Sequence, residues 1–160
     1  MNLENTVSII SFSPDLKEPI KTLNIEWLKK YFRVEPNDEK VLSNPQEEII
    51  DKGGMIFYAQ YQNAIVGTVS LIKIDDSAFE LSKMAVTDEV QGLGIGKKLL
   101  QHCMEVAEKE QIPKLILYSN KSLKPAIHLY EKFGFSEITL DEGIYERADI
   151  KMEKIFFDPK

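Results

Sequence analysis

Three glycines at alternating positions, Gly92, Gly94 and Gly96, separate a predicted strand at 79–86 from a predicted helix at 94–109. Glycine is entropically costly at the start of a helix, so it indicates an unusual backbone conformation or the close approach of another group. A strand–loop–helix unit directs backbone N–H groups and the positive end of the helix dipole to one point. These glycines therefore favour a ligand that carries phosphate.

Two common phosphate-binding loops do not fit these residues. The dinucleotide fingerprint G-x-G-x-x-G needs glycine at the position of Lys97. The Walker loop needs glycine at Gln91 and serine or threonine at Lys98. We expect neither a Rossmann site nor a P-loop, and the structural alternative is a turn that only allows close helix–strand packing.

Length and cysteine content limit the class of protein. The 160 residues, of which 43% are hydrophobic and 29% charged, predict a single domain over 1–160. The only cysteine, Cys103, excludes an internal disulfide, and the two histidines are far apart in sequence, so we expect no metal site. We find no signal peptide and no run long enough to span a bilayer, and so expect a cytoplasmic protein with no membrane partner.

The net charge of -6 and the pI near 5.1 bear on possible partners. Nucleic-acid binding depends on clustered lysine and arginine, so we do not expect a nucleic-acid partner. An acidic protein fits a cationic small substrate slightly better than an anionic one.

Hydrophobic periodicity predicts the element order β-α-α-β-β-β-α-β-α-β-β. Strands are expected at 7–12, 55–61, 65–74, 79–86, 115–118, 136–140 and 150–156. Helices are expected from 16 to 32 with Asp15 as cap, from Asn44-Pro45 to Gly53-Gly54, and at 94–109 and 123–133. Residues 33–44 are polar and contain Pro36, which predicts a loop or a short broken helix. His102 and His128 are expected to face solvent. This order implies an α/β (α+β) fold with a mixed sheet and helices on both faces.

Three segments resemble, in order, the motifs of the GNAT (Gcn5-related N-acetyltransferase) superfamily. MAVTDEVQGLGIGKKLL, residues 84–100, resembles the acetyl-CoA signature Q/R-x-x-G-x-G/A through Gln91, Gly94 and Gly96. PAIHLYEKFGF, residues 125–135, resembles the A-x-x-L-Y-x-x-x-G-F segment, and ELSKMAV, residues 80–86, resembles the central strand. The resemblance implies a GNAT-like acyl-CoA N-acyltransferase fold with a mostly antiparallel central sheet of about six to seven strands.

The same resemblance implies that acetyl-CoA is the cosubstrate. The loop would bind its pyrophosphate through backbone N–H groups, and the preceding strand would pair with its pantetheine arm. The residues so assigned are Met84, Ala85, Val86, Gln91, Gly92, Leu93, Gly94, Ile95, Gly96 and Lys97. The next strand, which ends near Tyr118 and Ser119, would splay away to leave a slot for the acyl group. Many family members have asparagine at the position of Leu123, and here Asn120 is the candidate replacement.

Acyl transfer to an amine by direct attack needs a base and an acid but no protein nucleophile. The candidate base is Glu80, acting through water, because apolar neighbours would raise its pKa. The alternative is a strand carboxylate paired with a lysine such as Lys83. The candidate acid is Tyr130, and the alternative is a core aromatic residue.

The family's acceptor pocket lies between the N-terminal helices and the loop 141–149. The resemblance therefore suggests Trp27, Tyr31, Tyr145 and Arg147 as acceptor-binding residues. Arg147 would clamp a carboxylate bidentately, or would form a surface salt bridge with Glu146 or Asp149. The acidic composition favours a cationic amine, whereas Arg147 favours an amino acid, so the acceptor stays open between small-molecule and peptide amines.

The leading hypothesis is therefore an N-acetyltransferase. A non-catalytic protein that senses acyl-CoA is the alternative from another class, and transfer of a succinyl or longer acyl group is a third. Relatives commonly form dimers, which makes a homodimer possible.

Overall fold

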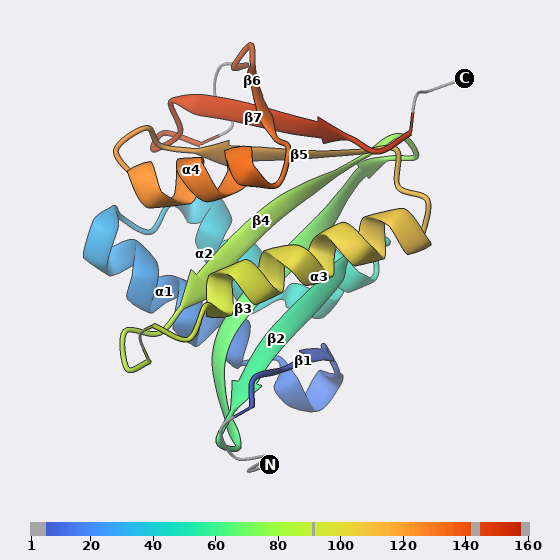
Figure 1. Cartoon of the computed structure of the whole chain (residues 1–160). Coiled ribbons are helices and arrows are strands. Elements are labelled where there is room, and N and C mark those ends of the chain that lie inside the picture. The colour runs from blue at the N-terminus through green and yellow to red at the C-terminus, as the bar shows by residue number, and fades with distance from the viewer. Residues whose placement is uncertain (1–5, 91, 142–144, 158–160) are drawn as a thin grey trace.

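Seven strands form one sheet in a computed structural model that describes residues 6–90, 92–141 and 145–157 (Figure 1). The strands are β1 (Ser8–Ser11), β2 (Met55–Tyr61), β3 (Ala64–Asp75), β4 (Ala78–Val86), β5 (Lys114–Ser119), β6 (Ser136–Ile138) and β7 (Ile150–Ile155). Their order is β1-β2-β3-β4-β5-β7-β6. Neighbours pair antiparallel except β4 and β5, which run parallel. The expected mixed, mostly antiparallel sheet is confirmed.

Helices cover both faces of this sheet, as the element order predicted. The helical segments are η2 (Pro14–Leu16), α1 (Pro19–Tyr31), α2 (Pro36–Ser43), η3 (Gln46–Ile50), α3 (Ile95–Lys109) and α4 (Lys124–Lys132). α3 and α4 lie over the near face in Figure 1, and α1 and α2 lie behind. Among the residues described, no helix has the length and apolar character needed to cross a membrane.

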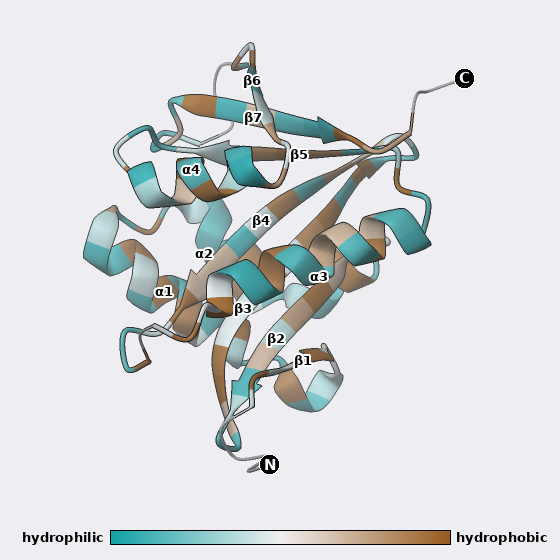
Figure 2. Cartoon of the chain, viewed as in Figure 1, coloured by the Kyte–Doolittle hydropathy of each residue, from teal (hydrophilic) through white to brown (hydrophobic). Residues whose placement is uncertain are grey.

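Each face of the sheet has its own hydrophobic core. Leu99, Leu100 and Cys103 of α3 are fully buried against β2, β3 and β4. On the other face Ile20, Leu42 and Tyr58 join α1 and α2 to β2. Figure 2 shows the hydrophilic side of α3 turned away from the sheet, as expected of an amphipathic helix.

The N-terminal end of α3 lies directly on β3 at Gly67. A Cβ atom at this glycine would meet Ile95 Cγ2 at 3.0 Å and Leu99 Cδ1 at 3.1 Å. Only a residue without a side chain allows this approach. Gly67 therefore lets the start of α3 pack against β3, and this packing positions the glycine loop, which connects β4 to α3.

Three local predictions need correction. Residues 36–43 form the regular helix α2, because Pro36 occupies its first turn and the Glu35 backbone N–H donates to Asp38 Oδ2 at 3.0 Å. The helix predicted from residue 16 begins only at Pro19, after the short turn η2, because proline favours the first helical position.

The third correction concerns His102, which does not simply face solvent. Its ring packs edge-on against Phe57, with 4.5 Å between the ring centroids. Burial of the imidazole lowers its pKa. His128 is exposed, as predicted.

Candidate functional site

A cleft opens where β4 and β5 separate. The two strands pair only between Ala78–Glu80 and Lys114–Ile116, although they continue to Val86 and Ser119. A cavity of about 270 Å³ lies in the gap and is bounded by both strands, α1, α4 and residues 145–148. The splay that the resemblance implied near Tyr118 is therefore present.

A second hollow of about 220 Å³ lies in front of the glycine loop. It shares Val86 and Asp88 with the cleft, so the two spaces adjoin. Gly92 and Gly94 have φ angles of 71° and 65°, and a Cβ atom on either would meet nothing within 4 Å. Their conformation favours glycine, and a methyl group at either position would have open space among the described residues beyond its chain neighbours.

The hollow faces the start of α3, whose N-cap is Gly94 with no side-chain cap. The N–H groups of Ile95, Gly96 and Lys97 belong to the first turn, where a helix supplies no acceptor of its own. Such N–H groups and the helix dipole together suit a phosphate. Leu93 also lines the hollow, Lys97 is exposed beside it, and Gln91 lies outside the described residues.

The strand segment Met84, Ala85 and Val86 connects the two spaces and lines the cleft. On its β5 side this segment pairs with no strand of the described residues, because pairing with β5 ends at Glu80. An extended ligand can pair with such an edge as an added strand does. The backbone here is therefore open to a chain such as pantetheine.

Glu80 lies where the two strands part. Its Oε2 accepts a hydrogen bond of 2.9 Å from the Tyr145 hydroxyl. Burial raises the pKa of the Glu80 carboxyl, and the hydrogen bonds from Tyr145 and Ser82 only partly oppose this rise. The pairing with Lys83 that the sequence allowed is not formed, since the Lys83 ammonium contacts Asp38 instead.

Tyr130 lines the cleft from α4 and is partly buried. Its ring packs edge-on against Phe135, with 6.1 Å between centroids, so it also belongs to the core. Burial raises the pKa of its hydroxyl to about 12. Among the residues that the structure describes, that hydroxyl has no hydrogen-bond partner, so it is free to donate into the cleft.

A bulge in β4 turns Lys83 into the cleft wall. Lys83 has a φ of 53°, and the pairing of β3 with β4 shifts between Thr68↔Ala85 and Ser70↔Ser82. Asn24 of α1 donates to the Lys83 carbonyl at 3.1 Å. This left-handed conformation is uncommon for a lysine, so it is held by its surroundings.

Four side chains, Glu35, Asp38, Lys83 and Arg147, form a charge cluster at the back of the cleft. Asp38 accepts from Lys83 Nζ at 2.8 Å and bidentately from Arg147 at 2.7 and 3.0 Å. Arg147 also donates to Glu35 at 2.5 Å. Burial alone would raise the pKa of Asp38, but hydrogen bonds from Arg147 and Lys83 hold it below its usual value.

The cluster was not predicted from the sequence, and it gives Arg147 partners that were not considered. Glu146 pairs with Arg33, and Asp149 accepts from the Lys121 backbone. The Arg147 side chain is only 19% exposed. A strand lysine among apolar residues, as in ELSKMAV, was the one available signal, since a buried lysine requires an anion.

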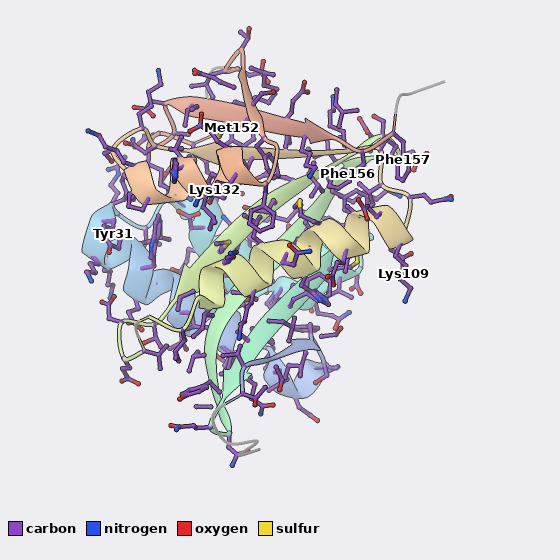
Figure 3. The ribbon with its side chains drawn as sticks, viewed as in Figure 1. Tyr31, Lys109, Lys132, Met152, Phe156 and Phe157 are labelled. Carbon is purple, nitrogen blue, oxygen red and sulfur yellow. The ribbon has the colours of Figure 1, made fainter. Side chains whose placement is uncertain are left out.

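Aromatic side chains line the cleft beside the charge cluster. Two cations lie near the Tyr145 ring: Lys83 Nζ is 5.2 Å from its centroid, and the Arg147 guanidinium is at 4.8 Å. Tyr118 packs on it at 5.6 Å. Trp27 and Tyr31 line the cleft from α1, and their ring centroids are 5.3 Å apart. Tyr31, labelled in Figure 3, is 48% exposed.

Asn120 also lines the cleft, but its side chain is engaged within the protein. Its Nδ2 donates to the Arg147 carbonyl at 2.7 Å, and its Oδ1 accepts from the Ser122 N–H at 2.9 Å. It therefore holds the segment that carries Arg147, and a contact with coenzyme stays a prediction. Within the described ranges, no three His, Cys, Asp or Glu side chains gather to hold a metal ion.

Comparison with known sequences supports one family. The family model for the acetyltransferase (GNAT) family matches residues 22–135. The [ribosomal protein bS18]-alanine N-acetyltransferase of Escherichia coli (strain K12) is 30% identical over 94 residues. Those residues are 59% of this chain and 64% of that protein, so the match spans less than two thirds of the relative.

Solved structures share the fold. A GNAT-family acetyltransferase from Staphylococcus aureus Mu50 matches with a TM-score of 0.82 and 24% identity, over 94% of this chain and 99% of that one. The PaiA N-acetyltransferase of Thermoplasma acidophilum, in complex with coenzyme A, matches with a TM-score of 0.71 and 22% identity, over 94% and 99%. With well over half of its length matched by the family model, the chain belongs to the GNAT acetyltransferase family.

Proposed function

We propose that the protein is an N-acetyltransferase that moves the acetyl group of acetyl-CoA to a primary amine of a small molecule or peptide, within one domain over 1–160. One observation carries the proposal: the cleft at Glu80 and Tyr130 adjoins the hollow at the start of α3 through Val86 and Asp88. One ligand can therefore hold phosphates at the helix and a thioester at the cleft. The relatives named above are N-acetyltransferases.

At the coenzyme end of the cleft, acetyl-CoA would be bound mainly by backbone groups. The pyrophosphate would meet the N–H groups of Gln91 to Lys97, and the pantetheine would pair with Met84 to Val86. The open space over Gly92 and Gly94 supports this assignment, because a ligand can reach the backbone there. Asn120 would contact the coenzyme in place of the asparagine that many relatives have at the position of Leu123.

The reaction would be direct attack in a ternary complex, with acetyl-CoA supplying the thioester. Glu80 accepts a proton from the ammonium through water, and its raised pKa makes it the stronger base. The amine then forms the N–C bond as the C–S bond breaks. Tyr130, protonated at neutral pH, donates its proton to the departing sulfur. The nitrogen loses a second proton once the N–C bond has formed, and this proton replaces the one that Tyr130 gave up.

The acceptor would enter between α1 and the segment 145–148. Trp27, Tyr31 and Tyr145 would contact it there, since all three line the cleft. A second copy of the chain is a possible partner, and the cytoplasm is the proposed compartment because the chain has a single, buried cysteine.

Release of free CoA thiol from acetyl-CoA, measured over a panel of amines, tests the function. The panel contains polyamines, aminoglycosides, amino acid amides, amino acids and short peptides, and the melting temperature is recorded with acetyl-CoA alone. We expect thiol release with at least one class of amine. A rise in melting temperature without thiol release would instead support the acyl-CoA sensor, and no rise would contradict coenzyme binding.

A further inference from the structure

We propose that the acceptor is a primary amine with no carboxylate next to the reacting nitrogen, and not a free α-amino acid. This inference rests on the proposed acetyltransferase function and narrows its substrate class. It is drawn from the charge cluster and from the groups that face the same cleft.

The cations of the cleft are already paired within the protein. Among the described residues, Lys83 and Arg147 are the two cations that line it. The Lys83 side chain is 3% exposed and contacts Asp38 at 2.8 Å. Arg147 Nη1 donates to both Glu35 and Asp38, and Nη2 donates to Asp38. With two carboxylates and two cations, the cluster is electrically neutral.

A substrate carboxylate would have to displace one of these internal partners. Asp38 is completely buried, and Glu35 is 11% exposed. Removing the guanidinium from them leaves buried negative charge without its partner, which is strongly destabilising. The substrate would gain one carboxylate–guanidinium pair at the expense of another of the same kind, so the exchange brings no net attraction.

Among the described residues of the cleft, the charged group without an ion pair is the carboxylate of Glu80, on which Lys83 and Arg147 act only as more distant charges. Glu80 receives hydrogen bonds from Tyr145 and Ser82, but it forms no ion pair with a cation among the described residues. A carboxylate on the carbon beside the amine would come close to Glu80 whenever the amine reached it, and like charges repel at such separations. An ammonium is attracted there, and the rings of Trp27, Tyr31 and Tyr145 accept apolar or cationic groups.

Three matched compounds test this inference in the thiol-release assay: phenylalanine, phenylalaninamide and phenethylamine. They share one ring and one primary amine and differ in the group beside it. The amide group of phenylalaninamide lowers the pKa of its amine, whereas phenethylamine has no such group. Similar kcat/KM values for these two compounds would therefore exclude an effect of amine ionisation. We expect kcat/KM for both to exceed that for phenylalanine by at least about tenfold, which corresponds to ~1.4 kcal/mol.

The Arg147→Gln variant separates the two roles of this residue. If Arg147 clamped a substrate carboxylate, the variant would lose activity on phenylalanine and keep it on phenylalaninamide. We expect the same fold-change for both compounds. Arg33→Gln is the matched control, because Arg33 pairs with Glu146 of the same segment and does not line the cleft.

The outcomes are distinct. Equal or better use of phenylalanine by the unaltered protein overturns the acceptor class while supporting the acetyltransferase. If no amine of the full panel causes release of CoA thiol, the proposed function is overturned, and the acceptor class with it. If Arg147→Gln fails to fold, the inference is decided by the unaltered protein, from its kcat/KM for phenylalaninamide and phenethylamine relative to that for phenylalanine.

Discussion

The two ends of the cleft are built in different ways. The proposed coenzyme end comes from residues 84–90 and 92–97 and presents backbone and space. The acceptor end comes from α1, α2, β4, β5 and the segment 145–148, and presents side chains. Its central contact, between Asp38 and Arg147, joins residues 109 positions apart in sequence.

On the proposed roles, members of one family would share the coenzyme end, whereas the acceptor end would determine which amine is the substrate. A backbone site tolerates many side chains provided that its glycines are kept. A site made of paired charges and rings changes its chemistry with each substitution. Substitutions at the two ends should therefore give different kinetic results, and the following predictions test that.

The largest effect is expected for Glu80→Gln, in the cleft where β4 and β5 separate. Because the amide cannot accept the proton, kcat should fall by roughly 10²–10⁴-fold. The KM for acetyl-CoA should change little. Steady-state kinetics measure both, with the melting temperature as a control for folding. An unchanged kcat would show that Glu80 is only a structural carboxylate.

The next effect is expected for Asp38→Ala. Lys83 and Arg147 would lose their shared partner inside the protein, which should lower the free energy of unfolding by about 3–5 kcal/mol. Denaturant unfolding measures the change. Glu39→Ala is the matched control, since Glu39 lies next to Asp38 on α2, is exposed, and makes its side-chain contacts at the surface with Lys21 and Ser43. Equal losses in the two variants would contradict the role of the cluster.

A smaller effect is expected for Gly94→Ala. The φ of 65° costs a residue with a Cβ atom about 1 kcal/mol, although nothing would contact the new methyl group. We expect weaker acetyl-CoA binding, measured by calorimetry, and lower stability. Gly96→Ala is the comparison, because Gly96 has a helical backbone where alanine stabilises. A larger loss of stability at Gly96 would reverse this expectation.

The smallest effect is expected for Tyr145→Phe. Without the Tyr145 hydrogen bond to its charged form, the pKa of Glu80 should rise further. A base is active when ionised, so the acid limb of the kcat/KM profile should move to higher pH, while the maximal kcat falls by less than about tenfold. Tyr118→Phe is the control, because the Tyr118 hydroxyl does not contact Glu80. A shift to lower pH would contradict the assignment.

The sequence predicted the strand, glycine loop and helix of the proposed coenzyme end because their determinants are local. Gly92 and Gly94 stand where a positive φ is needed, and the strand before them and the helix after them have clear periodicity. The family, the sheet and the helices on both faces followed from the same segments.

The charge cluster of the proposed acceptor end could not be predicted, because its determinants are distant. Lys83 reaches Asp38 only because a bulge gives it a φ of 53°, and the neighbours that hold the bulge lie on other elements. Asp38 was placed in a loop or broken helix, and its contacts with Lys83 and Arg147 depend on the complete fold. Local pattern cannot indicate such partners.

One carboxylate thus ties together three segments that are otherwise separate in sequence. Asp38 receives bonds from the Glu35 backbone, from Lys83 and from Arg147, so none of these contacts can open without disturbing the others. In native-state hydrogen exchange, α2, the bulge of β4 and the segment around Arg147 should open in a single cooperative event. The wall that meets the acceptor would then behave as one unit, while the glycine loop exchanges independently.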